Sequence, residues 1–325
     1  MRVAAFCFGR TILYWDTVLA VLAAAVFFLC FWAAYRANGG RARVLFALLP
    51  LGTLLALLLS RLLYACCRPG QFSDPRAFLD LSVGGFCLAG VVIALCFAAL
   101  LIRTVSPADE AVLLLDCAAP SLALALAILR LTNRFNGGCR GKLLLRDPRL
   151  QSTPFAAAEV PGGEYRLALY FISALLFVLF FLLLLRRYAR VYAENGASGR
   201  RGDVFLSFLL LFGAEEIVID SARNDACYFL FNAFVSVAQI LAGLTLLAVL
   251  IVLARREIRA HGLRARCVLC LLLWTVSLGA AGVSEYLVQR HGDRALSCYA
   301  LMSAAVLLML LATALLRRMS EKESG

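Results

Sequence analysis

Long apolar runs recur throughout this 325-residue chain, and they limit its fold more than any other feature. Residues 17–34, 167–185 and 295–316 contain no charged side chain. A helix needs about 20 mostly apolar residues to cross the hydrocarbon core of a bilayer, and it satisfies its backbone hydrogen bonds internally. The composition, 63% hydrophobic and 16% charged, is far from that of a soluble domain. The sequence therefore predicts an all-α, multi-pass integral membrane protein.

The apolar runs predict nine transmembrane helices, arranged as a seven-helix core and a C-terminal two-helix hairpin. The expected helices cover residues 17–34, 44–67, 81–102, 111–131, 167–185, a segment from 204, 227–254, 267–284 and 295–316. Tyr14 and Trp15 precede the first run and suit the membrane interface. We expect residues 1–258 to form the core domain and residues 259–325 to form the extra hairpin with a cytoplasmic tail.

The chain carries 32 basic against 20 acidic residues, a formal net charge of +12. In a membrane protein such an excess is typical of cytoplasmic loops and of contact with anionic headgroups. No interleaved basic and aromatic patch indicates nucleic acid as a partner. When the long segment 130–166 is left out, Lys and Arg are concentrated in the alternate loops that include the C-terminus. This asymmetry predicts an outer N-terminus and a cytoplasmic C-terminus.

A dense group of polar residues ends the fourth apolar run, and we call Arg130, Asn133, Asn136, Gly137 and Gly138 the polar cluster. A guanidinium at membrane depth is costly unless a polar or anionic group receives it. If the helix continues, Arg130, Asn133 and Gly137 share one face, and the two glycines then end the helix. A planar donor fork beside carboxamides and glycine N–H groups suits a phosphodiester. The alternative is that the positive charge anchors a helix end among the headgroups.

Acidic residues interrupt the sixth run. Glu216, Asp220 and Arg223 are spaced so that one helical face would carry all three. Asp220 and Arg223 could form an ion pair that neutralises itself. Alternatively, this face lies against the polar cluster, where Glu216 would neutralise a guanidinium or accept a proton. The two histidines, His261 and His291, lie in loops, so we expect no histidine base within the membrane.

The 12 cysteines form no spaced framework. Cys267-x-x-Cys270 resembles a redox or metal pair, but it lies in an apolar run with no histidine nearby. In such a setting thiols behave as small hydrophobic groups. We therefore predict no metal site.

Several motifs together resemble those of the prolipoprotein diacylglyceryl transferase family. Asp116-Cys-Ala-Ala-Pro120, followed by Arg130-x-x-Asn133-x-x-Asn136-Gly137-x-x-x-Gly141, is similar to the family's D-x-x-A-P and G-R-x-G-N-F-x-N-G-E-x-x-G. The likeness covers roughly residues 10–255. Further matching positions are Arg61, Tyr64, Asp74, Pro75, Gly84, Gly85, Gly90, Pro161, Tyr165, Phe212, Gly213, Asp220, Arg223, Asp225 and Gln239.

The resemblance implies an enzyme of the bacterial plasma membrane that uses no metal or soluble cofactor. Family members move the diacylglyceryl group of phosphatidylglycerol to the thiol of a lipobox cysteine in a preprolipoprotein and release glycerol phosphate. Phosphatidylglycerol and preprolipoprotein signal peptides are thus the expected partners. The resemblance assigns phosphate binding to Arg130, Asn133, Asn136 and Gly137, with support from Arg223. The motif residues expected to support the fold are Asp116, Pro120, Gly84, Gly85, Gly90, Gly141 and Gln239.

The chain departs from the family where acid–base chemistry is expected. Ala89 replaces the motif's histidine, Gly138 replaces a glutamate, and Glu216 replaces an arginine. Arg166 stands where the family has another glutamate. One hypothesis is a divergent diacylglyceryl transferase that uses Glu216 or Asp220 as its base. The others are a catalytically silent relative that binds phospholipid or a lipoprotein precursor, and a transferase with a different acceptor.

Overall fold

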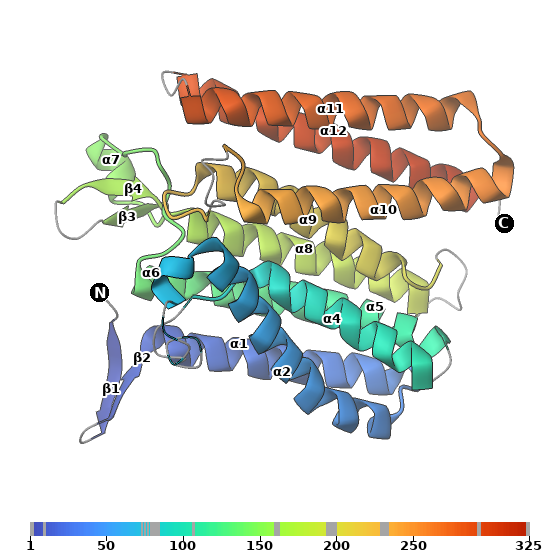
Figure 1. Ribbon diagram of the computed structural model, residues 1–325, viewed down its shortest axis with the longest axis horizontal. Coiled ribbons are helices and arrows are strands. Elements are labelled where there is room, and N and C mark those ends of the chain that lie inside the picture. Colours follow the sequence, from blue (N-terminus) through green and yellow to red (C-terminus); the bar gives the residue numbers. More distant parts are fainter. Residues whose placement is uncertain are drawn as a thin grey trace. The chain divides into compact units, whose positions relative to one another are not determined.

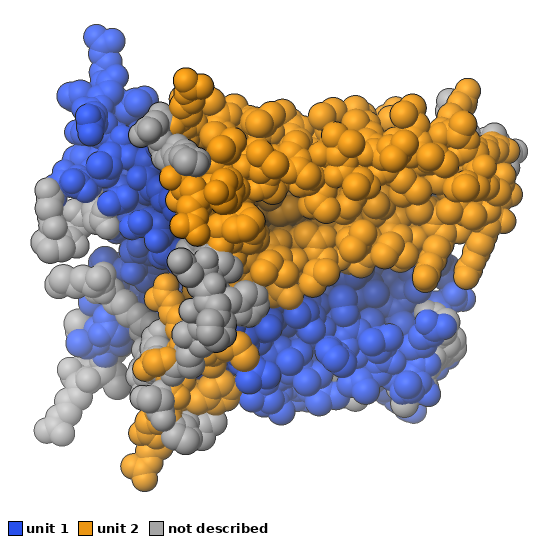
Figure 2. All heavy atoms as spheres, turned by 45° about the horizontal axis from the view of Figure 1, so that its top comes forward, with its two compact units in different colours: residues 1–63, 86–208, 222–226 blue, residues 64–85, 209–221, 227–325 orange. Residues whose placement is uncertain are grey.

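A computed structural model describes residues 3–8, 11–72, 74, 76, 78, 85–105, 108–158, 163–192, 200–227, 234–290 and 294–322. The chain divides into two compact units, which Figure 2 shows in different colours. Unit 1 comprises residues 1–63, 86–208 and 222–226, and unit 2 comprises residues 64–85, 209–221 and 227–325. Segments of the two units alternate along the sequence. The domain boundary expected after residue 258 stays a prediction.

The described residues are mostly helical (Figure 1), which confirms the predicted all-α, multi-pass membrane fold. Within the described ranges, 7 helices are long and apolar enough to cross a membrane, against the nine that the sequence predicted. The other two expected spans are also helices. Of these, α4 (Leu88–Val105) has only a shorter apolar stretch, and α9 (Asp203–Ala222) is interrupted by its acids.

Unit 1 is built around α5 (Ala108–Leu131), which packs against α1 (Trp15–Ala37), α4 and α8 (Leu169–Tyr192). Small buried residues allow these helices to approach α5 closely. They include Ala118, Ala119 and Ala123, each with no exposed surface. Pro120 lies inside α5 and is buried among them, as neighbouring helices permit for prolines of membrane helices.

Short elements that the sequence did not predict lie before α1 and between α5 and α8. β1 (Ala4–Phe8) and β2 (Thr11–Tyr14) form an antiparallel hairpin that leads directly into α1. β3 (Ala156–Ala158) pairs antiparallel with β4 (Tyr165–Leu167). The single-turn helices of unit 1 are α6 (Asn133–Asn136) and α7 (Pro148–Gln151).

Unit 2 contains the end of α9 together with α10 (Val237–His261), α11 (Ala265–Arg290), α12 (Ala295–Lys322) and the short 3-10 helix η1 (Pro69–Phe72). On both α11 and α12 a row of buried residues is spaced alternately by three and four, which keeps the row on one packing face. On α11 the row consists of Cys267, Cys270, Trp274, Ser277, Ala281, Ser284 and Val288, and Glu285 is buried beside it. On α12 the row consists of Met302, Ala305, Met309, Ala312 and Leu316, and Val306 and Thr313 are buried beside it.

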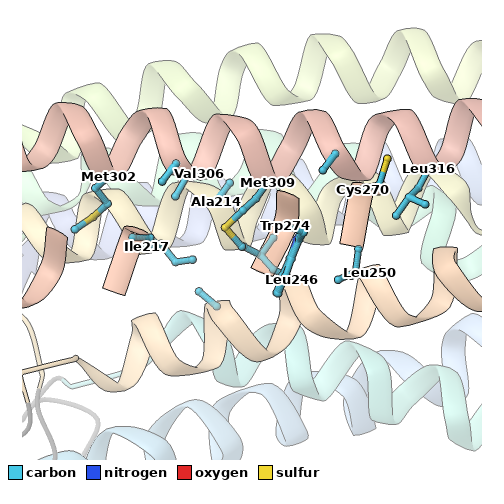
Figure 3. Close-up of a cluster of buried hydrophobic side chains, with 14 of the residues drawn as sticks. Ala214, Ile217, Leu246, Leu250, Cys270, Trp274, Met302, Val306, Met309 and Leu316 are labelled. Carbon is cyan, nitrogen blue, oxygen red and sulfur yellow. The ribbon is translucent and has the colours of Figure 1, made fainter. Parts of the chain in front are cut away.

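The same core extends to α9 and α10. Figure 3 shows Ala214 and Ile217 of α9 and Leu246 of α10 lying in one cluster with the residues of α11 and α12. Cys267 and Cys270 are free thiols that belong to this packing face. Their spacing is thus accounted for by helix packing.

The structure corrects three predicted helix boundaries. α4 begins well after residue 81, because Gly85 adopts a left-handed φ of 86° that ends any helix there. α10 begins ten residues later than expected, so Gln239 lies in its first turn and not in the middle of a span. α9 ends before Arg223, which forms an isolated β-bridge with Gly141. Gly84, Pro75, Pro161 and His291 lie outside the described residues.

Candidate functional site

Arg130 lies in the last turn of α5 and is only 3% exposed. Its guanidinium carbon is 5.7 Å from the ring centroid of Phe177 on α8, within the range of a cation–π interaction. Beyond Leu131 the chain makes one turn residue, Thr132, before α6 begins. The expected continuous helix is therefore broken just after the guanidinium, and α6 carries the two asparagines of the polar cluster as a separate turn.

The asparagines of α6 gather their carboxamides over Gly138. Gly137 ends the turn with φ 82°, and its N–H donates to the Asn133 carbonyl at 3.0 Å. The Gly138 N–H donates to Asn136 Oδ1 at 2.9 Å. A Cβ at position 138 would lie 2.7 Å from Asn133 Oδ1 and 3.1 Å from Asn136 Oδ1. Glycine at this position is thus what lets both carboxamides approach the backbone.

The segment that follows the polar cluster is held against the last residue of α9 and the residues directly after it. The Lys142 N–H donates to the Ala222 carbonyl and the Asn224 N–H donates to the Arg140 carbonyl, both at 2.8 Å. The Gly141 N–H donates to the carbonyl of Leu167 at 2.8 Å, which ties the segment to β4 as well. A Cβ on Gly141 would lie 3.0 Å from Leu167 Cβ, so this close approach favours glycine, and the hydrogen bonds fix the backbone directly beyond the polar cluster.

Arg223 and Asp225 form a bidentate pair beside this segment. Arg223 Nε donates to Asp225 Oδ1 at 3.1 Å, and Nη2 donates to Oδ2 at 3.0 Å. Asp225 Oδ2 also accepts the Cys139 N–H at 3.1 Å. Burial pushes the pKa of Asp225 up, but the hydrogen bonds and charge of Arg223 outweigh it and leave that pKa below its ordinary value. Asp225 was not predicted as a site residue, although its place in the family motif could have indicated it.

Asp116 is held by hydrogen bonds inside unit 1. Its carboxylate is fully buried and accepts the backbone N–H groups of Gly202 at 2.6 Å and Phe205 at 2.9 Å. Tyr192 Oη donates to the same carboxylate at 2.9 Å. These N–H groups lie at the start of α9, where a helix has unsatisfied donors and attracts negative charge. Asp116 therefore joins α5 to the ends of α8 and α9 within unit 1.

Gly90, Ala89 and Arg61 lie where α4 approaches α2 in unit 1. A Cβ on Gly90 would overlap the backbone of Ser60, so this glycine lets α4 touch α2 (Ala42–Cys67). Ala89, in the first turn of α4, brings a methyl group where the family has an imidazole. Arg61 is 3% exposed and lies 5.1 Å from the ring centroid of Phe86. No site role was predicted for this buried guanidinium, although a lone charge inside an apolar run is a signal of one.

In unit 2, Asp220 and Gln239 hold the end of α9 to the start of α10. The Ser236 hydroxyl donates to the Asp220 carboxylate, and Gln239 Nε2 donates to the Ile217 carbonyl at 3.2 Å. Ser236 and Gln239 also form a reciprocal capping box at the start of α10. Glu216 is 5% exposed on α9. The polar cluster belongs to unit 1, so the expected placement of Glu216 and Asp220 against it stays a prediction.

The fold and this site together identify the general class of protein. The chain is a polytopic membrane protein in which the central helix of unit 1 ends in a buried guanidinium and is followed directly by a turn that carries two carboxamides. The sequence profile of the prolipoprotein diacylglyceryl transferase family matches residues 4–255, and the chain belongs to that family. At the family level this means transfer of a diacylglyceryl group from a phospholipid to lipoprotein precursors. No match was found among curated proteins.

Proposed function

We propose that the protein transfers the diacylglyceryl group of phosphatidylglycerol to the thiol of a lipobox cysteine, with the polar cluster holding the lipid phosphate. The observation that carries the proposal is the Arg130 guanidinium, buried at the end of α5, with the Asn133 and Asn136 carboxamides gathered over Gly138 in the next turn. Arginine binds a phosphodiester through a planar pair of donors, and carboxamides supply further donors.

The charge change in the reaction explains why such a cluster would accelerate it. The cysteine sulfur forms a bond to the glyceryl carbon, and the bond from that carbon to the phosphate oxygen breaks. The electron pair leaves with glycerol phosphate, so a phosphodiester with one negative charge becomes a monoester with up to two. Donors fixed in place before the reaction stabilise this growing charge more than they stabilise the bound lipid. Arg130 and the two carboxamides are the proposed donors.

The thiol must also lose its proton, because the thiolate is the nucleophile. We propose Glu216 as the acceptor of that proton. Asp220 is the weaker candidate, because its carboxylate accepts the Ser236 hydroxyl and holds the start of α10. A Glu216→Gln variant that bound phospholipid normally but transferred it far more slowly would support this role. Unchanged transfer by the variant would exclude it.

The protein in this proposal lies in the bacterial plasma membrane with its N-terminus outside and its C-terminus in the cytoplasm. The excess of Lys and Arg in the loops on the C-terminal side supports this orientation. A reporter enzyme that is active only outside the cytoplasm, fused to the C-terminus, would be inactive in this orientation. An active reporter would show that the C-terminus lies outside the cytoplasm, opposite to the proposed orientation.

The test of the activity is transfer in reconstituted vesicles. Purified protein in vesicles containing phosphatidylglycerol is given a lipobox peptide, and released glycerol phosphate and the mass of the peptide are measured. We expect both products from the unchanged protein, a large loss with Arg130→Ala, and near-normal transfer with Arg134→Ala, which removes an exposed neighbouring guanidinium. A well-folded protein that yields neither product would refute the transferase.

A second candidate function is phospholipid binding without turnover. The observation that favours it is Ala89, which leaves the first turn of α4 without the acid–base group of the family motif. Here the purified protein would retain phosphatidylglycerol, lose it on Arg130→Ala, and form no product. Mass spectrometry of the lipid that remains after purification, run beside the transfer assay, separates this function from the first.

A further inference from the structure

The N-terminal hairpin (β1 and β2) exposes large apolar side chains on both of its faces. Phe6 pairs with Leu13 and the neighbouring Cys7 pairs with Ile12, so the Phe6 and Ile12 side chains point to opposite faces of the hairpin. Phe6 is 50% exposed and Ile12 is 52% exposed. A hairpin that lies in water normally presents one polar face. This hairpin instead exposes a large apolar side chain on each face.

The hydrogen-bonding groups of the backbone limit how deep such a hairpin can lie in a bilayer. β1 and β2 form a two-stranded sheet, so each strand has an outer edge that the sheet leaves unpaired. Unpaired backbone groups are excluded from the hydrocarbon core, where water cannot reach them. They are tolerated at the boundary between headgroups and acyl chains, where apolar side chains also gain from burial. The hairpin continues without a break into α1, a candidate membrane span whose first residue is Trp15.

A row of aromatic rings joins the hairpin to the turn that carries the asparagines of the polar cluster. The ring centroids of Phe6 and Trp15 are 6.0 Å apart, and those of Trp15 and Phe135 are also 6.0 Å apart with an interplanar angle of 27°. The Trp15 N–H donates to the Val3 carbonyl at 3.1 Å, which fixes the hairpin on the first turn of α1. In Figure 1 the hairpin projects from the same end of α1 that α6 contacts.

We propose that the N-terminal hairpin is an anchor embedded in the headgroup–acyl boundary of the lipid bilayer, and that the Phe6–Trp15–Phe135 row transmits its depth to α6. Tryptophan and tyrosine are enriched at this boundary. Because Phe135 lies between the two asparagines in the chain, fixing its ring fixes the depth of their carboxamides. The second half of this proposal rests on the proposed function, whereas the first half does not.

The first test measures depth in the bilayer. Phe6→Trp and Ile12→Trp are reconstituted separately in phosphatidylcholine–phosphatidylglycerol vesicles, and the added emission relative to the unchanged protein is recorded. Lipids brominated high on the acyl chain should quench the added tryptophan in both variants, while aqueous iodide should not. Leu150→Trp in α7, at a position 49% exposed in the polar segment after α5, is the matched control and should be quenched by iodide. Iodide quenching of the hairpin variants, without lipid quenching, would overturn the anchor.

Two further results separate the alternatives. If a lipobox peptide protects the added tryptophans from brominated lipid, the hairpin binds peptide and the proposal is wrong. For the link to α6, Phe135→Ala should leave hairpin quenching and the melting temperature unchanged while lowering phosphatidylglycerol retention several-fold. Unchanged retention would refute the link. Because the depth measurement needs no turnover, failure of the proposed transferase would leave the anchor intact, and failure of the anchor would leave the transferase intact.

Discussion

The Asp116 carboxylate of α5 accepts the backbone N–H of Phe205 at 2.9 Å, so a buried acid on one helix caps the start of another. Two more donors, the Gly202 N–H and the Tyr192 hydroxyl, converge on the same group. Three hydrogen bonds therefore converge on a single carboxylate that has no exposed surface. Hydrogen bonds within the fold thus account for an acid at position 116 of the motif, without any contact between this acid and a lipid.

Asp116→Asn should therefore destabilise the protein. The amide has one oxygen in place of two and brings its own donors towards N–H groups, so at least one hydrogen bond to charge is lost, at a cost of about 1–3 kcal/mol. A lower melting temperature in detergent would show this. Asp109→Asn, at an exposed position in the first turn of the same helix, is the control and should melt normally. Equal melting of the two variants would contradict the capping role.

Arg130→Lys should weaken phospholipid retention while leaving the fold intact. Lysine keeps the charge but loses the planar fork, and a lost charge-assisted hydrogen bond corresponds to about 10- to 100-fold in affinity. The lipid that remains with the purified protein is measured by mass spectrometry, with Arg134→Lys as the control on the exposed side of α6. If both variants retain lipid equally, the Arg130 guanidinium is a headgroup anchor only, as the alternative interpretation of the sequence holds.

The sequence predicted best what depends on local chemistry. The apolar runs gave the membrane fold, and Gly137 gave the end of the helical turn because a left-handed residue is needed there. The sequence predicted poorly those features that depend on contacts between segments far apart in the chain. Gln239 forms a capping box with Ser236, and the Ser236 hydroxyl also donates to a carboxylate of α9. These contacts place the start of α10 at residue 237, ten residues after the predicted start. Arg223 leaves its helix because the backbone there pairs with Gly141. Neither the hydrogen bond from Ser236 to α9 nor the pairing of Arg223 with Gly141 can be inferred from hydrophobic periodicity.

Asp225→Asn should lower stability at neutral pH but not in acid. The folded-state pKa of Asp225 lies below its ordinary value, so its contribution is complete above about pH 3.9 and is lost as the pH falls through the lowered pKa. The effect should stay below about 1 kcal/mol, because both members of the pair with Arg223 are partly solvated. Melting curves of both proteins should differ at pH 7 and converge in strong acid. A difference that persists there would assign the effect to packing.

Gly90→Ala should destabilise unit 1 markedly. The added methyl group would overlap the backbone of Ser60, which cannot move without separating α2 from α4, and overpacking of this kind costs about 1–3 kcal/mol. Gly52→Ala on α2 is the matched control, because a Cβ there meets nothing within 4 Å and alanine favours a helix. The melting temperature should fall for the first variant and hold or rise for the second. Equal melting would show that α2 and α4 can separate freely.

Gly138→Ala should separate binding from folding. The new Cβ would press on Asn133 Oδ1 and Asn136 Oδ1, which are the ends of side chains that can turn away at little cost. The melting temperature should therefore stay nearly constant, while both carboxamides leave their place above the backbone. If they hold the lipid phosphate, losing one hydrogen bond should reduce phosphatidylglycerol retention by about tenfold. Gly70→Ala, at an exposed position of η1 with nothing within 4 Å of an added Cβ, controls for glycine replacement outside the cluster. Full retention by Gly138→Ala would mean that the carboxamides do not touch the phosphate.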